Sequence, residues 1–378
     1  MSNSSTSFTT VRYHGLDLLR AIALLLGLFF HAAIPFFAGP KNLQWIIYYD
    51  NNFRIFNWIA DFIHSFRMPL FFILAGFFSS LLLSKYGLKL FIRMRFRKLV
   101  IPFIASMVFL TPLMIYQFIA AGHHGERITL STYPVFHLWF LEVLIIITSL
   151  SIFFYLVKGT MQNVIRTTHF LPLLNALKRS GQWQYAILLA LLLFLGWSPF
   201  PGDQFSDSFS IIQSPTKILY YSIYFFIGWR LYNDRILFDA LRKYFLLNLC
   251  IGFISVVSMC GIRYWLFYHS SSFPIEIVIF GNFTSTLAAI HLSVGFFGLF
   301  ISERFKQNAF IDYLVRASYW TYLIHLPVMF FVQVKIASWQ IDAMIKYSFT
   351  VFISFLFCSF TFSTYEQISR AITTRKVG

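Results

Sequence analysis

The chain alternates long apolar runs with short polar segments along almost its whole length. A helix that crosses a lipid bilayer needs about 20 mainly apolar residues. Runs that meet this requirement lie at 16–38, 56–84, 99–121, 137–157, 183–199, 217–233, 244–268, 278–301, 317–336 and 344–366. The pattern predicts an all-α, polytopic membrane protein with about ten transmembrane helices, which form a single domain over residues 15–370.

The composition agrees with this pattern. Hydrophobic residues make up 58% of the chain and charged residues 12%, whereas soluble domains carry about 25% charged residues. None of the polar segments between the runs is long enough to form a soluble catalytic domain. Any chemistry must therefore take place within the helix bundle or at its two faces.

Lys and Arg gather in every second polar segment. The basic segments are 85–98, 158–182, 230–243, 302–316 and the C-terminal tail, and the segments between them carry few Lys or Arg. By the positive-inside rule the basic side faces the cytoplasm. This predicts cytoplasmic N- and C-termini, with residues 1–14 and 371–378 as tails and the first tail flexible. Because the net charge of +16 is divided among loops beside membrane lipid, nucleic acid is not an expected partner.

The first apolar run carries three ionisable residues. Asp17 and Arg20 lie near its cytoplasmic end, three residues apart, so their side chains can pair. His31 follows Arg20 by eleven residues, which is roughly 16 Å of helix and places both side chains on one face. This spacing leaves two interpretations open: a snorkelling Arg20 with a packing His31, or two functional residues that face the bundle.

The second run contains Asp61, His64 and Arg67 at intervals of three residues. Ionisable side chains at bilayer depth are costly, so these three must face the bundle interior or water. We therefore expect this helix to contribute to a functional site.

Later runs contain further polar residues, which lie near the predicted outer face or inside the bundle. They are His137, Trp139 and Glu142 in the fourth run, His291 in the eighth, and Tyr322 and His325 in the ninth. Ordinary hydrogen bonds between helices explain His291 and His325 equally well. The sequence contains no helical pair of ligands at metal-binding spacing, so no metal site is expected.

The basic segment 85–98 ends in Arg93, Arg95, Arg97 and Lys98. Contact with anionic lipid is one interpretation. The density of charge also suits the binding of phosphate groups, to which guanidinium and ammonium groups donate strong hydrogen bonds.

Several of these motifs together resemble the acyltransferase 3 family of integral membrane acyltransferases. The matching stretches are DLLRAIALLLGLFFH (17–31), FIHSFRMPLFFILAGFF (62–78), RFRKLVIPF (95–103), HLWFLEVL (137–144) and YLIHLP (322–327). Arg20 and His31, with ten residues between them, resemble the Arg/Lys-x10-His signature of the family. Lys98 departs from the family pattern, which usually has a second Arg there. FIHSFRM, HLWFL and YLIHLP look most like the glucans biosynthesis protein C branch, which is similar to succinyltransferases of osmoregulated periplasmic glucans.

The resemblance implies a multi-pass enzyme of the bacterial inner membrane. It would transfer an acyl group, with succinyl favoured, from cytoplasmic acyl-CoA to hydroxyl groups of a periplasmic glucan. The donor would be succinyl-CoA or acetyl-CoA as a substrate, and no bound cofactor is implied. His31 would act as general base or as acyl carrier.

The chain offers side chains for the other roles that such a reaction needs. Asp17 would fix Arg20, and His64 or Arg67 would stabilise the oxyanion. The donor phosphates would bind Arg93, Arg95, Arg97 and Lys98, and the acceptor sugar would bind His137, Trp139, Glu142, Tyr322 and His325.

Two other functions remain compatible with the sequence. One is an O-acetyltransferase that acts on O-antigen or another exported polysaccharide. The other is a secondary transporter in which the buried Asp, Arg and His side chains form a relay, although the chain lacks the internal repeat that transporters often show.

Overall fold

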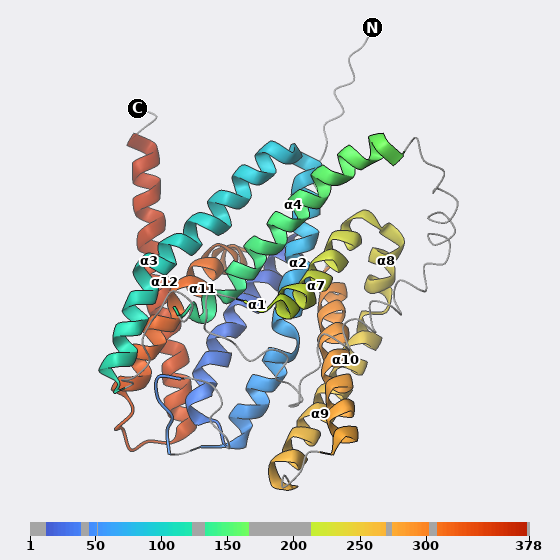
Figure 1. Cartoon of the computed structure of the whole chain (residues 1–378). Helices are drawn as coiled ribbons and strands as arrows, with labels where there is room; N and C mark the ends of the chain where they lie inside the picture. Colours follow the sequence, from blue (N-terminus) through green and yellow to red (C-terminus); the bar gives the residue numbers. More distant parts are fainter. Residues whose placement is uncertain are drawn as a thin grey trace.

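The computed structural model describes residues 13–38, 45–50, 52–122, 133–165, 213–269, 274–301 and 308–375, and these are mostly helical (Figure 1). The helices are α1 (His14–Ala33), η1 (Ile34–Phe36), α2 (Arg54–Arg95), η2 (Phe96–Val100), α3 (Ile101–Ala120), η3 (Phe136–Leu138), α4 (Trp139–Ile165), α7 (Pro215–Asn233), α8 (Arg235–Lys243), α9 (Phe245–His269), α10 (Ile275–Phe300), α11 (Ala309–Lys335) and α12 (Ala343–Arg375). The predicted all-α class is confirmed for these ranges.

Six segments within the described ranges are long and apolar enough to cross a membrane. They are His14–Phe36, Arg54–Ala120, Phe136–Val157, Phe245–Leu266, Ile275–Phe300 and Ala343–Ile372. The segment Arg54–Ala120 contains both α2 and α3, whereas α7 and α11 fall outside the set. The number of ten spans and the cytoplasmic termini therefore stay predictions. The expected span 183–199, most of the expected tail 1–14 and residues 376–378 lie outside the described residues.

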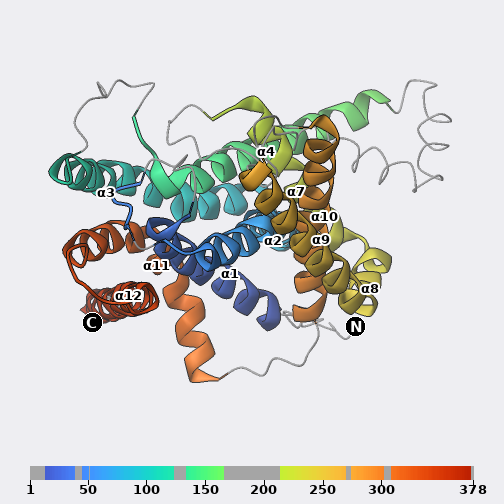
Figure 2. The ribbon, with the colours of Figure 1, turned by 90° about the horizontal axis from the view of Figure 1, so that it is seen from below.

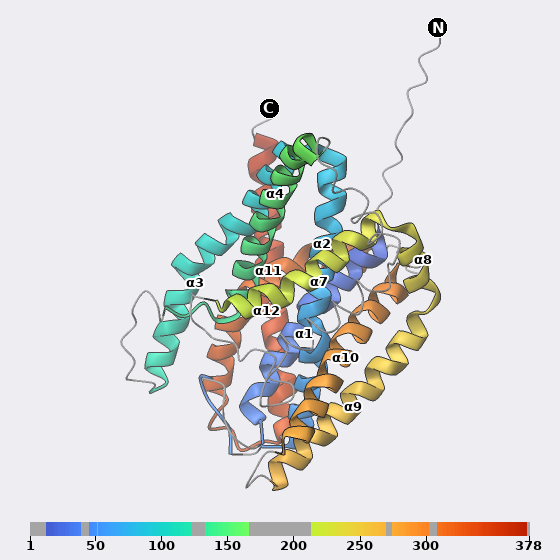
Figure 3. The ribbon, with the colours of Figure 1, turned by 45° about the vertical axis from the view of Figure 1, so that its right-hand side comes forward.

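α1 and α2 form the centre of the bundle (Figure 2). α11 packs against α1, and α12 and α3 pack against α11 on that side. On the other side α7 packs along α2, and α9 and α10 run side by side as an antiparallel pair (Figure 3). The central pair therefore presents one face to α11 and another to α7 and α10.

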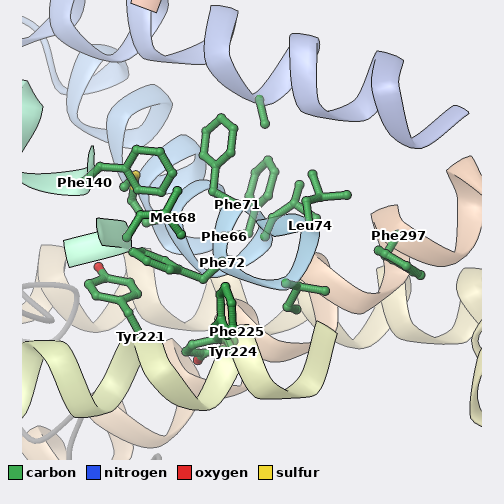
Figure 4. Close-up of a cluster of buried hydrophobic side chains, with 14 of the residues drawn as sticks. Phe66, Met68, Phe71, Phe72, Leu74, Phe140, Tyr221, Tyr224, Phe225 and Phe297 are labelled. Carbon is green, nitrogen blue, oxygen red and sulfur yellow. The ribbon is translucent and has the colours of Figure 1, made fainter. Parts of the chain in front are cut away.

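Two glycines allow α2 and α7 to approach closely. A Cβ atom added at Gly76 would come within 1.8 Å of the Phe225 carbonyl oxygen, and one at Gly228 equally close to the Ile73 carbonyl oxygen. Small residues at a crossing let helix backbones touch in a membrane protein. Large buried aromatic side chains fill the core around this crossing (Figure 4). This packing fixes which face of α2 points towards α1.

α2 runs eleven residues beyond the predicted end of the second span at residue 84. It changes direction at Gly87, whose φ of 72° lies in the left-handed region that favours glycine. Beyond this bend, the rest of α2 and the π-helix η2 carry the basic residues 93–98. The predicted loop 85–98 is thus helical, and the bend at Gly87 sets its direction.

Candidate active site

A cavity lies between α1, α2, α11 and the segment η3–α4. It encloses about 640 Å³ of space not filled by atoms, including its open mouth. The residues of α1 that line it are Ala23, Leu24, Gly27, Phe30 and His31, and Ile34 of η1 follows them. These positions follow the helical period and extend the face of α1 on which Arg20 lies. The helix face that Arg20 and His31 are predicted to share therefore continues into the wall of the cavity.

Three histidines from distant parts of the chain meet in this cavity. They are His31 on α1, His137 on η3 and His325 on α11, and each is buried. His31 Nδ1 lies 2.8 Å from His325 Nε2, and the two rings stack with centroids 5.1 Å apart. The ring of His137 lies edge-on to that of His325 at 5.0 Å.

The partners of His325 determine which nitrogen of His31 can act as a base. Nδ1 of His325 faces the carbonyl oxygens of Tyr322 at 2.8 Å and Thr321 at 3.0 Å, and carbonyls only accept, so Nδ1 carries a hydrogen. In neutral His325, Nε2 is then an acceptor, and Nδ1–H of His31 donates to it. This leaves the lone pair of neutral His31 on Nε2.

His137 offers a second nitrogen with a lone pair. Its Nε2 donates to the Leu323 carbonyl oxygen at 3.1 Å. Its Nδ1 is buried and has no hydrogen-bond partner among the described residues. A buried polar atom without a partner is uncommon in proteins. In a cavity wall it is a natural acceptor for a substrate hydroxyl.

Arg67 brings a guanidinium to the same cavity. It lies 9% exposed on α2, and its Cζ atom is 5.2 Å from the centroid of the Phe30 ring. Gly27 makes room for it, because an added Cβ atom there would lie 2.6 Å from Arg67 Nη1. Arg67 and the three histidines thus surround one space, as the oxyanion role predicted for Arg67 requires.

The other two ionisable residues of the second run point elsewhere. The ring of His64 stacks on Phe30 with centroids 5.3 Å apart, but His64 does not line the histidine cavity. Asp61 forms an ion pair with Arg263 on α9. All three side chains face the bundle rather than lipid, as predicted, but the structure separates Arg67 from Asp61 and His64.

The predicted acceptor residues take different positions. Tyr322 and Trp139 line the cavity, but the Tyr322 hydroxyl donates to the His137 carbonyl oxygen at 2.9 Å and so supports η3. Glu142 lies outside the cavity lining and accepts a hydrogen bond from Gln213 at 2.9 Å. Lys217 is buried beside it, with Nζ 3.7 Å from the centroid of the Trp139 ring. Lys217 was not predicted, although a Lys that opens an apolar run is a detectable signal.

Gln333 on α11 connects the segment 45–50 to the site, and the sequence did not predict this role. Its Oε1 accepts from Trp45 Nε1 at 3.0 Å and its Nε2 donates to the His31 carbonyl oxygen at 3.3 Å. The Tyr49 hydroxyl donates to the Gln333 carbonyl oxygen at 2.7 Å, and burial raises the pKa of Tyr49 above its ordinary range, so it keeps this proton. Trp45 in turn stacks on His31 at 5.6 Å.

We expect the Gln333→Leu variant to unfold more easily. The substitution keeps the side-chain size but leaves Trp45 Nε1 and the His31 carbonyl oxygen without these partners, which costs about 1–3 kcal/mol for each buried group left unsatisfied. Thermal unfolding in detergent would measure the effect. The matched control is Gln340→Leu at an exposed position in the segment after α11, and an equal shift in both variants would contradict the role of Gln333.

The predicted donor residues lie at the end of the bundle near the start of α1. Arg20 pairs with Asp17 at 3.3 Å. Arg95 Nη2 donates to Ser79 Oγ at 2.6 Å, and its positive charge interacts with that of Arg20. The three other members of the set, Arg93, Arg97 and Lys98, are exposed. Arg20 and Arg95 are therefore the guanidinium groups that the structure brings together.

Tyr319 links this basic end to the cavity. Its hydroxyl donates to the Lys98 carbonyl oxygen at 2.8 Å, and its ring stacks on Tyr322 at 6.2 Å. Tyr319, Tyr322 and His325 follow one another at intervals of three along α11, so they form one row from η2 to the histidines. Within the described part of the chain, no group of three or more His, Cys, Asp or Glu could hold a metal ion.

Comparison with known proteins connects this site to an enzyme family. The family described as an acyltransferase domain matches residues 13–364. The chain is 25% identical over 344 residues to glucans biosynthesis protein C of Escherichia coli O139:H28 (strain E24377A / ETEC), which covers 85% of this chain and 83% of that relative. It is 32% identical over 166 residues to the protein of the same name from Salmonella paratyphi B, covering 39% of this chain and 40% of the relative. No solved structure matches the chain.

Proposed function

This chain belongs to the acyltransferase 3 family and is an acyl-transferring membrane enzyme, and on that premise we propose that it transfers a succinyl group from acyl-CoA to hydroxyl groups of a periplasmic glucan. The observation that carries the proposal is the hydrogen-bonded pair of His31 and His325, in a cavity that also contains His137 and Arg67. The glucan acceptor is supported by the names of the relatives in Escherichia coli and Salmonella.

The face of α1 that carries Arg20 and His31 has two ends, and each end suits one of the two substrates, acyl-CoA and glucan. Arg20 and Arg95 lie at the end that the positive-inside rule assigns to the cytoplasm, where their charges would attract the phosphates of acyl-CoA. His31 lies near the other end of α1, beneath the segment that contains Trp45. The row of Tyr319, Tyr322 and His325 joins the two ends, and the thioester arm would lie along it. The enzyme would then lie in the bacterial inner membrane.

His31 is the proposed general base. Its Nε2 accepts the proton of the acceptor hydroxyl while that oxygen forms a bond to the thioester carbonyl carbon. The negative charge that develops on the carbonyl oxygen is stabilised by Arg67. The C–S bond then breaks, and the proton passes from His31 to the departing sulfur, so the products are the O-acyl glucan and CoA.

A covalent variant uses the same atoms. Nε2 of His31 would attack the thioester carbon and expel CoA as its thiolate, which leaves an N-acylimidazolium. The acceptor hydroxyl would then attack the acyl carbon, neutral His31 would be regenerated, and the hydroxyl proton would pass to the thiolate to give CoA. The hydrogen bond from Nδ1 to His325 supports both routes because it keeps the lone pair on Nε2. A brief reaction without acceptor, followed by mass measurement of the intact protein, separates the two.

Acyl transfer in reconstituted membranes tests the proposed function. Labelled succinyl-CoA and acetyl-CoA are supplied in turn together with periplasmic glucan, and the label on the glucan is measured. We expect transfer from succinyl-CoA to exceed transfer from acetyl-CoA. A preference for acetyl-CoA, or transfer to another exported polysaccharide only, would contradict the assignment of donor or acceptor.

For the donor end we expect the Arg95→Gln variant to bind acyl-CoA about tenfold more weakly. The loss of one charge-assisted hydrogen bond of about 1.5–3 kcal/mol corresponds to at least that change. Titration of the protein in nanodiscs with a non-transferable acyl-CoA analogue measures the affinity. Arg93→Gln is the matched control, because Arg93 lies on the same helix and is exposed. Equal losses in the two variants would mean that the segment acts only through its overall charge.

A further inference from the structure

Pro327 interrupts the backbone hydrogen bonding of α11 close to His325. It lies inside the helix and is buried. In an α-helix the N–H group of each residue donates to the carbonyl oxygen four residues earlier, and proline has no N–H group. The carbonyl oxygen of Leu323 therefore lacks the donor that residue 327 would otherwise provide. The proline ring also clashes with that carbonyl in its regular helical position, which favours a tilt away from the helix axis.

A histidine ring takes the place of the missing donor. His137 Nε2 lies 3.1 Å from the Leu323 carbonyl oxygen, and a carbonyl oxygen only accepts, so Nε2 carries the hydrogen. In the neutral ring the lone pair is then on Nδ1. This atom is buried and has no hydrogen-bond partner among the described residues, and His137 lines the histidine cavity. The missing N–H group of Pro327 thus sets the nitrogen with which His137 can accept a hydrogen.

The backbone around His137 is held in a conformation that places its ring in the cavity wall. Phe136 has a φ of 46°, in the left-handed region that is strained for a bulky side chain. Its ring packs against Phe118 of α3 at 5.5 Å and Phe330 of α11 at 6.1 Å. The Tyr322 hydroxyl donates to the His137 carbonyl oxygen at 2.9 Å. Such strain persists where surrounding contacts enforce it, and strained residues gather at active sites.

The same stretch of α11 orients His325. Its Nδ1 faces the carbonyl oxygens of residues 321 and 322, so together with Leu323 three successive carbonyl oxygens accept from histidine rings. These bonds leave a lone pair on Nε2 of His325, which accepts from His31, and another on Nδ1 of His137. The second lone pair is the one that no residue of the proposed acyl transfer uses.

We propose that Pro327 is a positioning residue for acyl transfer, which acts through His137. By leaving the Leu323 carbonyl oxygen to Nε2 of His137, it keeps the lone pair on Nδ1, where it accepts a hydrogen bond from a hydroxyl group of the acceptor. The proposal rests on the proposed function for the identity of that hydroxyl group. It gives a role to the proline that ends the stretch YLIHLP (322–327).

Two replacements at position 327 separate the missing N–H group from the proline ring. Pro327→Ala restores an N–H group that can donate to the Leu323 carbonyl oxygen. The ester analogue of alanine at this position, introduced as an α-hydroxy acid, has the size of alanine and no N–H group. The matched control is Pro112→Ala, which replaces an exposed proline inside α3. NMR of nitrogen-labelled histidine in nanodiscs reports which ring nitrogen carries hydrogen, and the His137 signals are identified by their absence in His137→Gln.

We expect the hydrogen of His137 on Nε2 in the wild type, in Pro112→Ala and in the ester variant. In Pro327→Ala both nitrogens should carry hydrogen in part, because Leu323 gains a competing donor. The KM for glucan should then rise about fivefold, the change that corresponds to one ordinary hydrogen bond, while the KM for acyl-CoA stays unchanged. The ester variant should recover the wild-type KM for glucan. A merely structural role would instead change both KM values together.

The possible results separate this proposal from the proposed function. Hydrogen on Nδ1 of His137 in the wild type would overturn the role of Pro327, even if a variant fails to fold. Equal behaviour of Pro327→Ala and the ester variant would also overturn it. If Pro327→Ala keeps the wild-type tautomer and KM while the wild type acylates glucan, the positioning role is wrong and the function stands. If the tautomer changes in Pro327→Ala and recovers in the ester variant, but the wild type transfers no acyl group to glucan, the positioning role stands and the function is wrong.

Discussion

Replacement of His31 by Ala is expected to lower acyl transfer about 10²–10⁴-fold, the contribution typical of a general base. The physical reason is the arrangement around its ring. Nδ1 is engaged with His325 at 2.8 Å, so Nε2 is the nitrogen that can take a proton in the cavity. The measurement is the rate of label transfer from succinyl-CoA to glucan in membranes.

Two further variants make this result specific. His31→Gln keeps a side-chain donor near His325 but provides no basic nitrogen, so we expect a similar loss of activity with little loss of stability. His291→Ala is the matched histidine control. His291 lies outside the cavity lining and bonds to Asn248 on α9 at 2.9 Å, which is one of the two interpretations that the sequence left open. Retention of activity in His31→Gln would contradict base catalysis by His31.

The helices of this protein could be predicted well where apolar runs end in polar residues or Pro. The predicted span 217–233 corresponds to α7 (Pro215–Asn233), and 278–301 corresponds closely to α10 (Ile275–Phe300). The end of α2 was placed too early. A basic segment resembles a loop by composition, yet Arg, Lys and Leu are good helix formers and Gly87 supplies the one left-handed residue that the bend needs.

The site could be predicted only along single helices. The common face of Arg20 and His31 follows from the 3.6-residue period, and the cavity lining along α1 has that period. The contact between His31 and His325 joins positions 294 residues apart, and no local pattern specifies which helices become neighbours. For the same reason the sequence did not indicate that His137 and His325 lie beside His31, where the structure brings them; their acceptor role stays a prediction. The role of Gln333 was not predicted, because an amide within an apolar run carries no charge and gives a weak signal. Polar groups at that depth nevertheless need hydrogen-bond partners.

The Arg67→Gln variant is expected to lose about 10²–10³-fold in acyl transfer, as seen when one oxyanion donor is removed. Arg67 is held against Phe30 and lines the histidine cavity, and no Asp or Glu is among the described residues lining that cavity. A thioester bound in this cavity would place its carbonyl oxygen within reach of the Arg67 guanidinium. Arg67→Lys keeps the charge but not the planar fork of donors, so it should recover only part of the rate.

A second substitution moves the guanidinium without removing it. In Gly27→Ala the new Cβ atom would lie 2.6 Å from Arg67 Nη1, so the guanidinium must shift. A displacement of about 1 Å in a catalytic group can cost roughly 10²-fold in rate. Gly261→Ala is the matched control, since a Cβ atom added at this α9 glycine meets nothing within 4 Å. We expect Gly27→Ala to lose activity and Gly261→Ala to keep it.

The choice of donor then distinguishes two ways in which Arg67 could act. A charge that stabilises the oxyanion helps every thioester, so Arg67→Gln should reduce transfer from succinyl-CoA and from acetyl-CoA by similar factors. A charge that instead binds the free carboxylate of the succinyl group helps only the first donor. Selective loss of succinyl transfer would therefore contradict the oxyanion role and make Arg67 the residue that selects the acyl group, because a buried carboxylate needs a paired cation in this cavity.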